Sequence, residues 1–163
     1  MIAYSLDNFV IIPLPVIMRT GGSSLSILVF EDHTATARLI TTAFEETSEA
    51  VSVRTVSSGH SGLDMLYGEA DEQVDPDLIL LDLGLPDTKG ETVLESIRTN
   101  DNTRHLPIVV LSGQSDEQTI KRCYENGANT FIPKPDDFDG YRFLAKTMLR
   151  YWQHSANLPA ESS

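Results

Sequence analysis

Short apolar runs alternate with longer amphipathic stretches along most of this chain. The runs favour strands, because each is short and rich in branched apolar residues. The predicted strands are Leu25–Phe30, Val51–Val56, Asp77–Leu81, Leu106–Leu111 and Thr130–Pro133. The intervening stretches space their apolar residues three and four positions apart, as in a helix with one buried face. The predicted helices are His33–Ser48, Ser58–Glu69, Gly90–Thr99, Asp116–Asn126 and Asp136–His154.

This order of elements predicts an α/β fold: a doubly wound, five-stranded parallel sheet flanked by five helices. A run such as Leu106–Leu111 is apolar at nearly every position, which is typical of a parallel strand covered by helices on both faces. Ligands of such sheets bind beyond the carboxyl ends of the strands. We therefore expect the functional residues directly after the strands.

Composition narrows the classes of partner. The 163 residues fit one domain, and their 40% hydrophobic content can form a core without disulfides or metals. The net charge of −12 repels phosphate backbones and anionic lipids, so we expect neither DNA binding nor membrane binding. The single cysteine, Cys123, excludes an internal disulfide and favours a reducing, cytoplasmic location.

Residues 1–24 are expected to form a poorly ordered N-terminal extension. The apolar segment Phe9–Met18 is too short to span a bilayer, and no basic residues precede it as in a secretion signal. Two alternatives stay open: the extension packs on the domain, or Met18 is the true start. The domain itself is expected over residues 25–154, followed by a short polar tail over 155–163.

Charged and polar side chains follow four of the predicted strands. They are Glu31, Asp32, Asp82, Ser112 and Lys134. If the sheet is parallel, three carboxylates meet at one edge, where they repel one another unless a cation is present. Mg²⁺ prefers oxygen ligands, and a carboxylate beside it could attack a phosphoryl group while the lysine offsets the negative charge. The pattern predicts a phosphoryl-transfer site that forms an aspartyl phosphate.

These residues resemble the receiver domains of two-component response regulators. The motifs are LVFED (Leu28–Asp32), PDLILLDLGLPDTKG (Pro76–Gly90), PIVVLSG (Pro107–Gly113) and GANTFIPKP (Gly127–Pro135). The resemblance covers Leu25 to Trp152 and implies a flavodoxin-like sheet with strand order 2-1-3-4-5. The stretches LDLGLP, PKPDDFD and YWQHSANLP also resemble the single-domain regulators that serve phytochrome-type and other sensor kinases.

The resemblance implies a role for each residue of the acidic group. Asp82 would accept the phosphoryl group. Asp32, Asp82 and the backbone carbonyl of Gly84 would bind Mg²⁺ directly, and Glu31 would bind it through water. Gly84 and Gln114 stand where the side chains of this family influence the lifetime of the phosphate.

The remaining roles fall on the last two strands. Ser112 and Gly113 would bind the phosphoryl oxygens, and Lys134 would form an ion pair with the phosphate. Phe131 occupies the position of the aromatic switch residue, where Tyr is commoner. Pro135 would follow Lys134 in a cis peptide bond.

The resemblance implies a phosphorylation switch served by a sensor histidine kinase or a histidine phosphotransfer protein. Its output face would be the predicted helix Asp116–Asn126, strand Thr130–Pro133 and helix Asp136–His154, where a partner or a second copy would dock. An aspartyl phosphatase is disfavoured because Gly84 stands where such enzymes carry their general acid, so we expect at most self-phosphorylation and self-dephosphorylation. A receiver-like adaptor that is never phosphorylated is the alternative. His33 adjoins the acid pair, but imidazole is not a usual Mg²⁺ ligand, and a loop or first-turn role is preferred.

Overall fold

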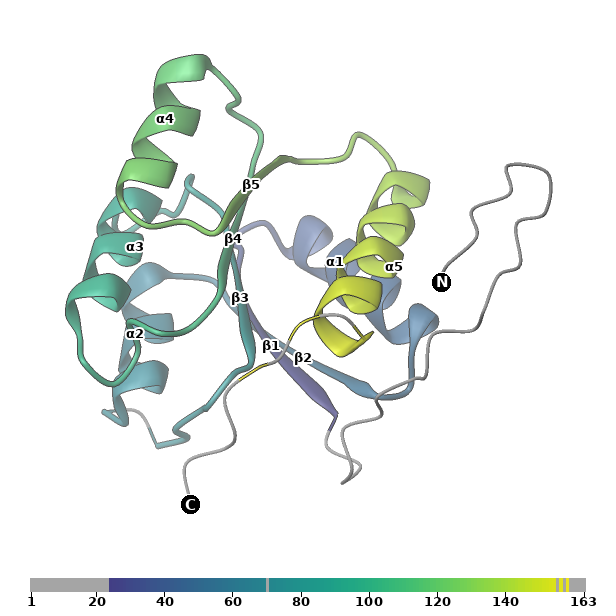
Figure 1. Ribbon diagram of the computed structural model, residues 1–163, viewed down its shortest axis with the longest axis horizontal. Helices are drawn as coiled ribbons and strands as arrows, with labels where there is room; N and C mark the ends of the chain where they lie inside the picture. The colour runs from purple at the N-terminus through teal and green to yellow at the C-terminus, as the bar shows by residue number, and fades with distance from the viewer. Residues whose placement is uncertain (1–23, 70, 155, 157, 159–163) are drawn as a thin grey trace, which may run out of the picture.

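A computed structural model describes residues 24–69, 71–154, 156 and 158 of the chain. These residues form a five-stranded parallel sheet in the order β2-β1-β3-β4-β5 (Figure 1). The predicted fold class and strand order are confirmed. The extension predicted over residues 1–24 lies outside the described residues except for Ser24, as does most of the tail predicted over 155–163.

Strands and helices alternate along the chain in the predicted order. The strands are β1 (Leu25–Phe30), β2 (Val51–Val56), β3 (Leu78–Leu81), β4 (Ile108–Ser112) and β5 (Thr130–Pro133). The helices are α1 (Thr34–Thr47), α2 (Gly59–Tyr67), α3 (Gly90–Thr99), α4 (Glu117–Glu125) and α5 (Phe138–His154). The bounds differ from the predicted ones by one or two residues at several ends. Ser58 and Asp116, for example, keep extended backbones and cap the helices that follow them.

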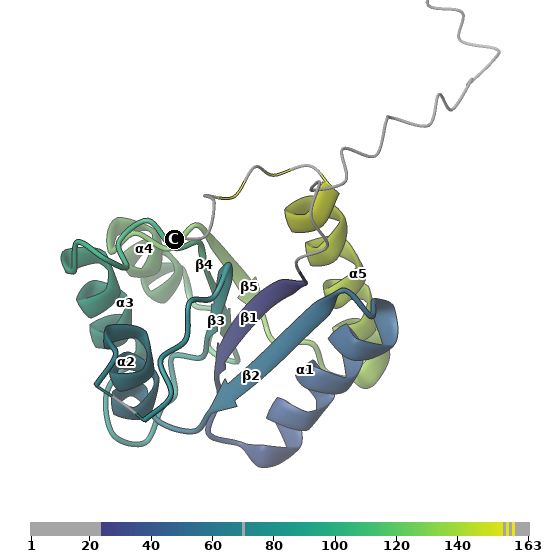
Figure 2. The same cartoon turned by 90° about the horizontal axis from the view of Figure 1, so that it is seen from below.

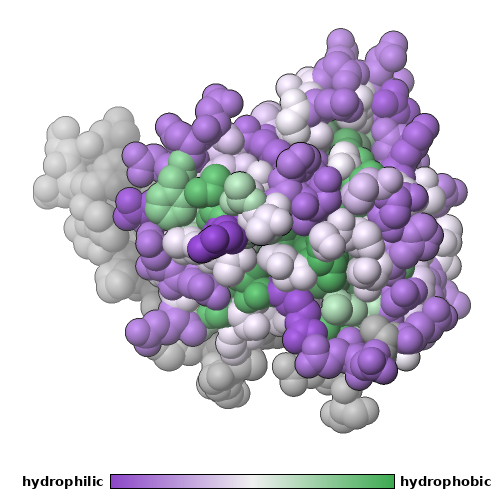
Figure 3. All heavy atoms as spheres, turned by 180° about the vertical axis from the view of Figure 1, so that it is seen from behind, coloured by the Kyte–Doolittle hydropathy of each residue, from purple (hydrophilic) through white to green (hydrophobic). Residues whose placement is uncertain are grey.

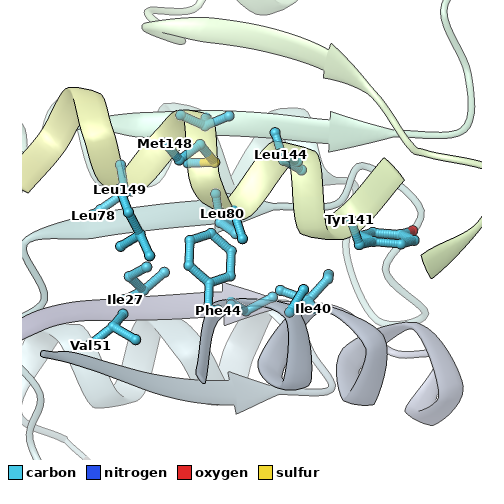
Figure 4. Close-up of a cluster of buried hydrophobic side chains, with 14 of the residues drawn as sticks. Ile27, Ile40, Phe44, Val51, Leu78, Leu80, Tyr141, Leu144, Met148 and Leu149 are labelled. Atoms are coloured by element: carbon cyan, nitrogen blue, oxygen red, sulfur yellow. The ribbon is translucent and has the colours of Figure 1, made fainter. Parts of the chain in front are cut away.

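The sheet separates two apolar clusters. Helices α1 and α5 cover one face, and α2, α3 and α4 cover the other (Figures 1 and 2). Side chains of a strand alternate between faces, so Leu78 and Leu80 of β3 join the α1–α5 cluster while Ile79 and Leu81 join the other. In Figure 4, Phe44 of α1 points toward Leu80 from the α1 side of this cluster. Burial on both faces explains why these strands are apolar throughout.

Glycine at position 90 is required where α3 begins. A Cβ atom there would lie 2.5 Å from the Cα atom of Leu83 and 2.7 Å from the carbonyl oxygen of Asp82. Both of these are backbone atoms, which a side chain could not displace cheaply. The start of α3 therefore packs directly on the segment that follows β3 and carries Asp82.

Candidate functional site

The carboxyl edge of the sheet brings together acidic residues and one lysine from three strands. Glu31 and Asp32 follow β1, Asp82 follows β3 and Lys134 follows β5. The Lys134 Nζ atom lies 2.6 Å from Glu31 Oε2 and 2.9 Å from Asp82 Oδ2. Glu31 is 3% exposed and Asp82 is 6% exposed. Four residues up to 103 positions apart thus form one largely buried group of charges.

Charge in this group is unbalanced, because three carboxylates face one ammonium. Burial opposes the charged form of Lys134, but the hydrogen bonds that its ammonium donates to Glu31 and Asp82 outweigh this and raise the pKa of Lys134. Asp32 Oδ1 is buried and has no hydrogen-bond partner, whereas Glu31 Oε2 is paired with Lys134 Nζ at 2.6 Å. Buried carboxylate oxygens without hydrogen bonds are costly, so the group has unused capacity for a cation.

Ligand atoms for a metal ion are already close together. Glu31, Asp32, His33 and Asp82 each offer one ligand atom, and these atoms lie within 4.8 Å of one another. Carboxylate oxygens suit a hard divalent cation such as Mg²⁺, which commonly takes one or two carboxylates plus water. The residues present therefore fit a metal ion of this kind.

The segment after β3 brings Gly84 close to the Asp82 carboxylate. The Gly84 amide donates a hydrogen bond to Asp82 Oδ1 at 3.2 Å. A Cβ atom at position 84 would lie 3.7 Å from Asp82 Oδ2, which is ordinary contact. A side chain at this position would therefore lie against the carboxylate, and glycine leaves that space open.

The end of β4 carries a buried hydroxyl. Ser112 is 2% exposed, and its Oγ accepts a hydrogen bond from the Gln114 amide at 3.1 Å. Its carbonyl oxygen accepts a hydrogen bond from the Lys134 amide at 2.9 Å, so β4 and β5 reach the site in register. A Cβ atom at Gly113 would meet nothing within 4 Å. The structure thus brings Ser112 to the same edge, with open space beside it.

The peptide bond between Lys134 and Pro135 is trans, so the predicted cis bond is wrong. An X–Pro bond prefers trans by about 0.5–1 kcal/mol, and its local sequence alone does not override that preference. The Lys134 side chain still reaches both carboxylates.

Phe131, at the position expected for an aromatic switch, is half-buried and packs against the cluster under α2, α3 and α4. Its amide donates a hydrogen bond to the Tyr124 hydroxyl of α4 at 3.1 Å. Strand β5 is an edge of the sheet, and Pro133 has no N–H to offer there. Tyr124 was not predicted from the sequence, because its partner is the backbone amide of residue 131, and every residue except proline carries such an amide.

Two further residues near the site were missed. Asp87 accepts hydrogen bonds from the Gly59 and His60 amides at 2.8 and 2.9 Å, and so ties the β3–α3 segment to the start of α2. Tyr141 of α5 is 4% exposed, and burial raises the pKa of its phenol. Tyr141 lies at one end of the cluster in Figure 4. The helical spacing of Tyr141 in the sequence predicts a buried core residue and gives no sign that it lies near the site.

Comparison with known proteins identifies the family. Residues 27–145 match the response regulator receiver domain. The chain belongs to this family. Receivers of this family are components of two-component systems, and receiver domains bind Mg²⁺.

Individual relatives resemble the receiver over most of its length. It is 32% identical over 127 residues to the probable methanogenesis regulatory protein FilR2 of Methanothrix harundinacea, covering 77% of this chain and 82% of that protein. It is 28% identical over 136 residues to the response regulator Rcp1 of Synechocystis, covering 82% of this chain and 92% of Rcp1. A crystal structure of Rcp1 holds Mn²⁺; it matches with a TM-score of 0.75 and covers 83% of this chain and 99% of that one.

The phosphorylated cyanobacterial phytochrome response regulator RcpA is also similar in structure. Its TM-score is 0.80 at 31% identity, covering 85% of this chain and 100% of that chain. The resemblance to phytochrome-associated regulators therefore extends from short motifs to the whole receiver fold.

The outer surface of the receiver is mixed. On the face drawn in Figure 3, apolar areas are interrupted by hydrophilic residues. Among the described residues, no helix combines the length and the apolar character needed to cross a membrane.

Proposed function

We propose that this receiver is a phosphorylation-dependent signalling switch, with Asp82 as the phosphoacceptor. One observation carries the proposal: the Asp82 carboxylate lies 2.9 Å from Lys134 Nζ, within a group of acids that has room for a cation. A carboxylate oxygen of Asp82 attacks phosphorus, and the bond from phosphorus to the donor's histidine nitrogen breaks, with that nitrogen keeping the electron pair. The donor is a sensor histidine kinase or a histidine phosphotransfer protein.

The neighbouring residues hold the reactants. Asp32, Asp82 and the Gly84 carbonyl would hold Mg²⁺, and Glu31 would hold it through water. The metal ion, when bound, offsets the charge that develops on the phosphoryl oxygens. Lys134 supplies a second positive charge and is already aimed at Asp82.

Output follows from the new charge. Phosphorylation consumes the negative charge of the Asp82 carboxylate and adds a phosphoryl group that carries about −1.5 to −2, so the net change is about −0.5 to −1. The group also adds oxygens that accept hydrogen bonds. Ser112 and Gly113 turn toward these oxygens, and Phe131 repacks with them. The face formed by α4, β5 and α5 then docks a partner protein or a second copy of the chain. The lifetime of the phosphate depends on positions 84 and 114, where Gly84 leaves the carboxylate open and Gln114 is exposed.

The proposal includes the setting of the switch. The receiver acts in the cytoplasm as the domain 25–154, without DNA binding, and its only catalysis is Mg²⁺-dependent self-phosphorylation and self-dephosphorylation. Residues 1–24 and 155–163 are appendages to this domain. The second candidate is an adaptor that binds its partners without being phosphorylated.

Beryllofluoride, which mimics an acyl phosphate, tests the proposal. We would titrate it with Mg²⁺ into the full chain and follow Trp152 fluorescence and molecular size by light scattering. We expect a Mg²⁺-dependent response that Asp82→Ala abolishes. Asp101→Ala is the matched control, because Asp101 is an exposed acid after the end of α3 that is remote from Asp82, and its loss should leave the response intact.

The outcomes separate the two candidates. A response lost in Asp82→Ala and kept in Asp101→Ala supports the switch, and a change in size adds dimerisation as its output. No response in the parent protein contradicts the switch and favours the unphosphorylated adaptor. A response kept in Asp82→Ala would move the phosphoacceptor to another residue.

A further inference from the structure

His33 adds a nitrogen atom to the acidic group. Its Nδ1 atom lies 3.0 Å from Asp32 Oδ1 and 3.4 Å from Glu31 Oε1. The His33 amide also donates a hydrogen bond to Glu31 Oε1 at 3.0 Å, which fixes the backbone of residue 33 beside the acids. The imidazole thus lies against two of the three carboxylates.

The His33 imidazole contacts the acidic group rather than the amides at the start of α1. His33 occupies the N-cap position of α1, yet its side chain makes no capping hydrogen bond. Asp32 Oδ1 is buried and makes no hydrogen bond of acceptable angle, even though Nδ1 lies 3.0 Å away. The two atoms therefore lie at a distance where one bound cation can take both as ligands.

The spacing fits neighbouring ligands of one metal ion. Adjacent ligands of an octahedral ion with bonds of about 2.1 Å lie about 3.0 Å apart, and opposite ligands lie about 4.2 Å apart. The Nδ1 to Oδ1 distance matches the first value. The largest spread in the group, 4.8 Å, needs a small contraction to reach the second.

We propose that His33 is an additional metal ligand, which shifts the preference of this site toward transition-metal ions that accept nitrogen, such as Co²⁺ and Ni²⁺, relative to Mg²⁺. The inference rests on the proposed metal site and deepens it. Imidazole suits transition metals, whereas Mg²⁺ is held by carboxylate, carbonyl and water oxygens. Loss of His33 should therefore affect the two classes of ion unequally.

Metal titrations of the full chain test this selectivity. We expect His33→Ala to weaken Co²⁺ binding by at least roughly 10-fold, the loss that even a residue behind a metal ligand can cause. Mg²⁺ binding should change by less than about 2-fold, because imidazole contributes little to that ion. His33→Gln, which retains a long polar side chain with an oxygen donor, should keep Mg²⁺ binding and still lose Co²⁺ preference.

A second histidine offers a matched control. The side chain of His60 is 72% exposed against 71% for His33, and its Nδ1 contacts the carboxylate of Asp87. It is not part of the acidic group, so His60→Ala should leave both affinities unchanged. Pulsed electron paramagnetic resonance on bound Cu²⁺, a paramagnetic ion that imidazole suits, adds a direct readout: a nitrogen coupling present in the parent protein and in His60→Ala but absent from His33→Ala.

Each result has one meaning. A selective loss of Co²⁺ binding, together with the loss of nitrogen coupling, supports the proposal. Equal weakening of Co²⁺ and Mg²⁺ overturns it and makes His33 a residue that only positions Asp32. Unchanged Co²⁺ binding in His33→Ala also overturns it. A parent protein that binds neither ion would instead overturn the metal site on which the proposed function depends.

Discussion

The two edges of the sheet each hold a basic side chain among oxygen atoms, but they satisfy it differently. At the amino edge, Arg98 donates from Nε to the Gly127 carbonyl, from Nη1 to the Arg104 and Leu106 carbonyls, and from Nη2 to Asn129 Oδ1. All of these acceptors are neutral. At the carboxyl edge, Lys134 forms ion pairs with Glu31 and Asp82, and the buried Asp32 Oδ1 has no hydrogen-bond partner.

This difference separates stability from function. The Arg98 group joins the end of α3 to the segments before β4 and β5, and its fork of donors is matched by acceptors. Burial lowers the pKa of the guanidinium, yet Arg98 stays charged because its ordinary pKa is so high. The acidic group leaves Asp32 Oδ1 without a hydrogen-bond partner, and its ligand atoms fit a cation. The amino edge of the sheet therefore stabilises the fold, whereas the carboxyl edge is arranged to bind a ligand.

The largest expected effect is the loss of Arg98. Arg98→Met should lower the free energy of unfolding by about 3 kcal/mol, because it leaves partly buried carbonyl oxygens without a charged donor. Arg98→Lys should recover only part of this, since one ammonium cannot reproduce the planar fork. Urea unfolding followed by Trp152 fluorescence measures both changes.

The surface residue Arg104 controls for the loss of a positive charge. Its exposed ion pair with Asp101 should contribute little, so Arg104→Met is expected within about 0.5 kcal/mol of the parent. The folded Arg98→Met protein should still bind beryllofluoride with Mg²⁺. Loss of that binding in folded protein would show that the two edges are coupled and would contradict their separation.

Removal of an acid at the other edge should have the opposite sign. Without metal, Asp32→Asn should raise the free energy of unfolding by about 1 kcal/mol, because it relieves repulsion among like charges. With Mg²⁺, the parent should gain stability by binding and the variant should gain much less. Thermal unfolding with and without Mg²⁺ measures this. A variant that is less stable than the parent without metal would mean that Asp32 is already satisfied.

The acidic edge was predictable because its charges belong to side chains, which can be recognised in the sequence. Carboxylates and a lysine directly after apolar runs meet at one edge as soon as the sheet is parallel. The Arg98 group was not predictable, since three of its acceptors are backbone carbonyls that every residue carries. The same reason hides the hydrogen bond from the Phe131 amide to Tyr124.

Errors at the level of single bonds have a related origin. The cis bond at Pro135 was inferred from a family resemblance, whereas this chain keeps the trans form. The predicted and observed helix bounds differ where a capping residue precedes a helix. Ser58, for example, fits the sequence pattern of α2, but its backbone is extended and the helix begins at Gly59. Alternation of apolar and amphipathic segments determines topology, but local geometry depends on contacts that form only in the fold.

The smallest effect tests whether satisfaction of hydrogen bonds, rather than position in the sheet, decides what a charge does. Asp87 lies on the carboxyl side but is fully partnered. Partial burial favours its neutral form, but hydrogen bonds from the His60 and Gly59 amides and from the His60 ring outweigh this and hold the pKa of Asp87 well below its ordinary value. Asp87 should therefore stabilise the fold, unlike Asp32 without metal.

The sign of the pH dependence follows from that lowered pKa. The stability that ionised Asp87 contributes is fully present above the ordinary aspartate pKa of 3.8 and is lost as pH falls through that value toward the lower pKa of the folded state. At pH 7, Asp87→Asn should cost about 1 kcal/mol, the typical value of a helix N-terminal cap. The gap between parent and variant should narrow as pH falls below 3.8, in denaturant unfolding measured across that range. His60→Ala should cost less, because the amide hydrogen bonds to Asp87 remain. If the difference in free energy of unfolding between parent and variant stays constant with pH, Asp87 acts through shape rather than charge. If Asp87→Asn stabilises the protein, Asp87 destabilises the fold as Asp32 is expected to do without metal.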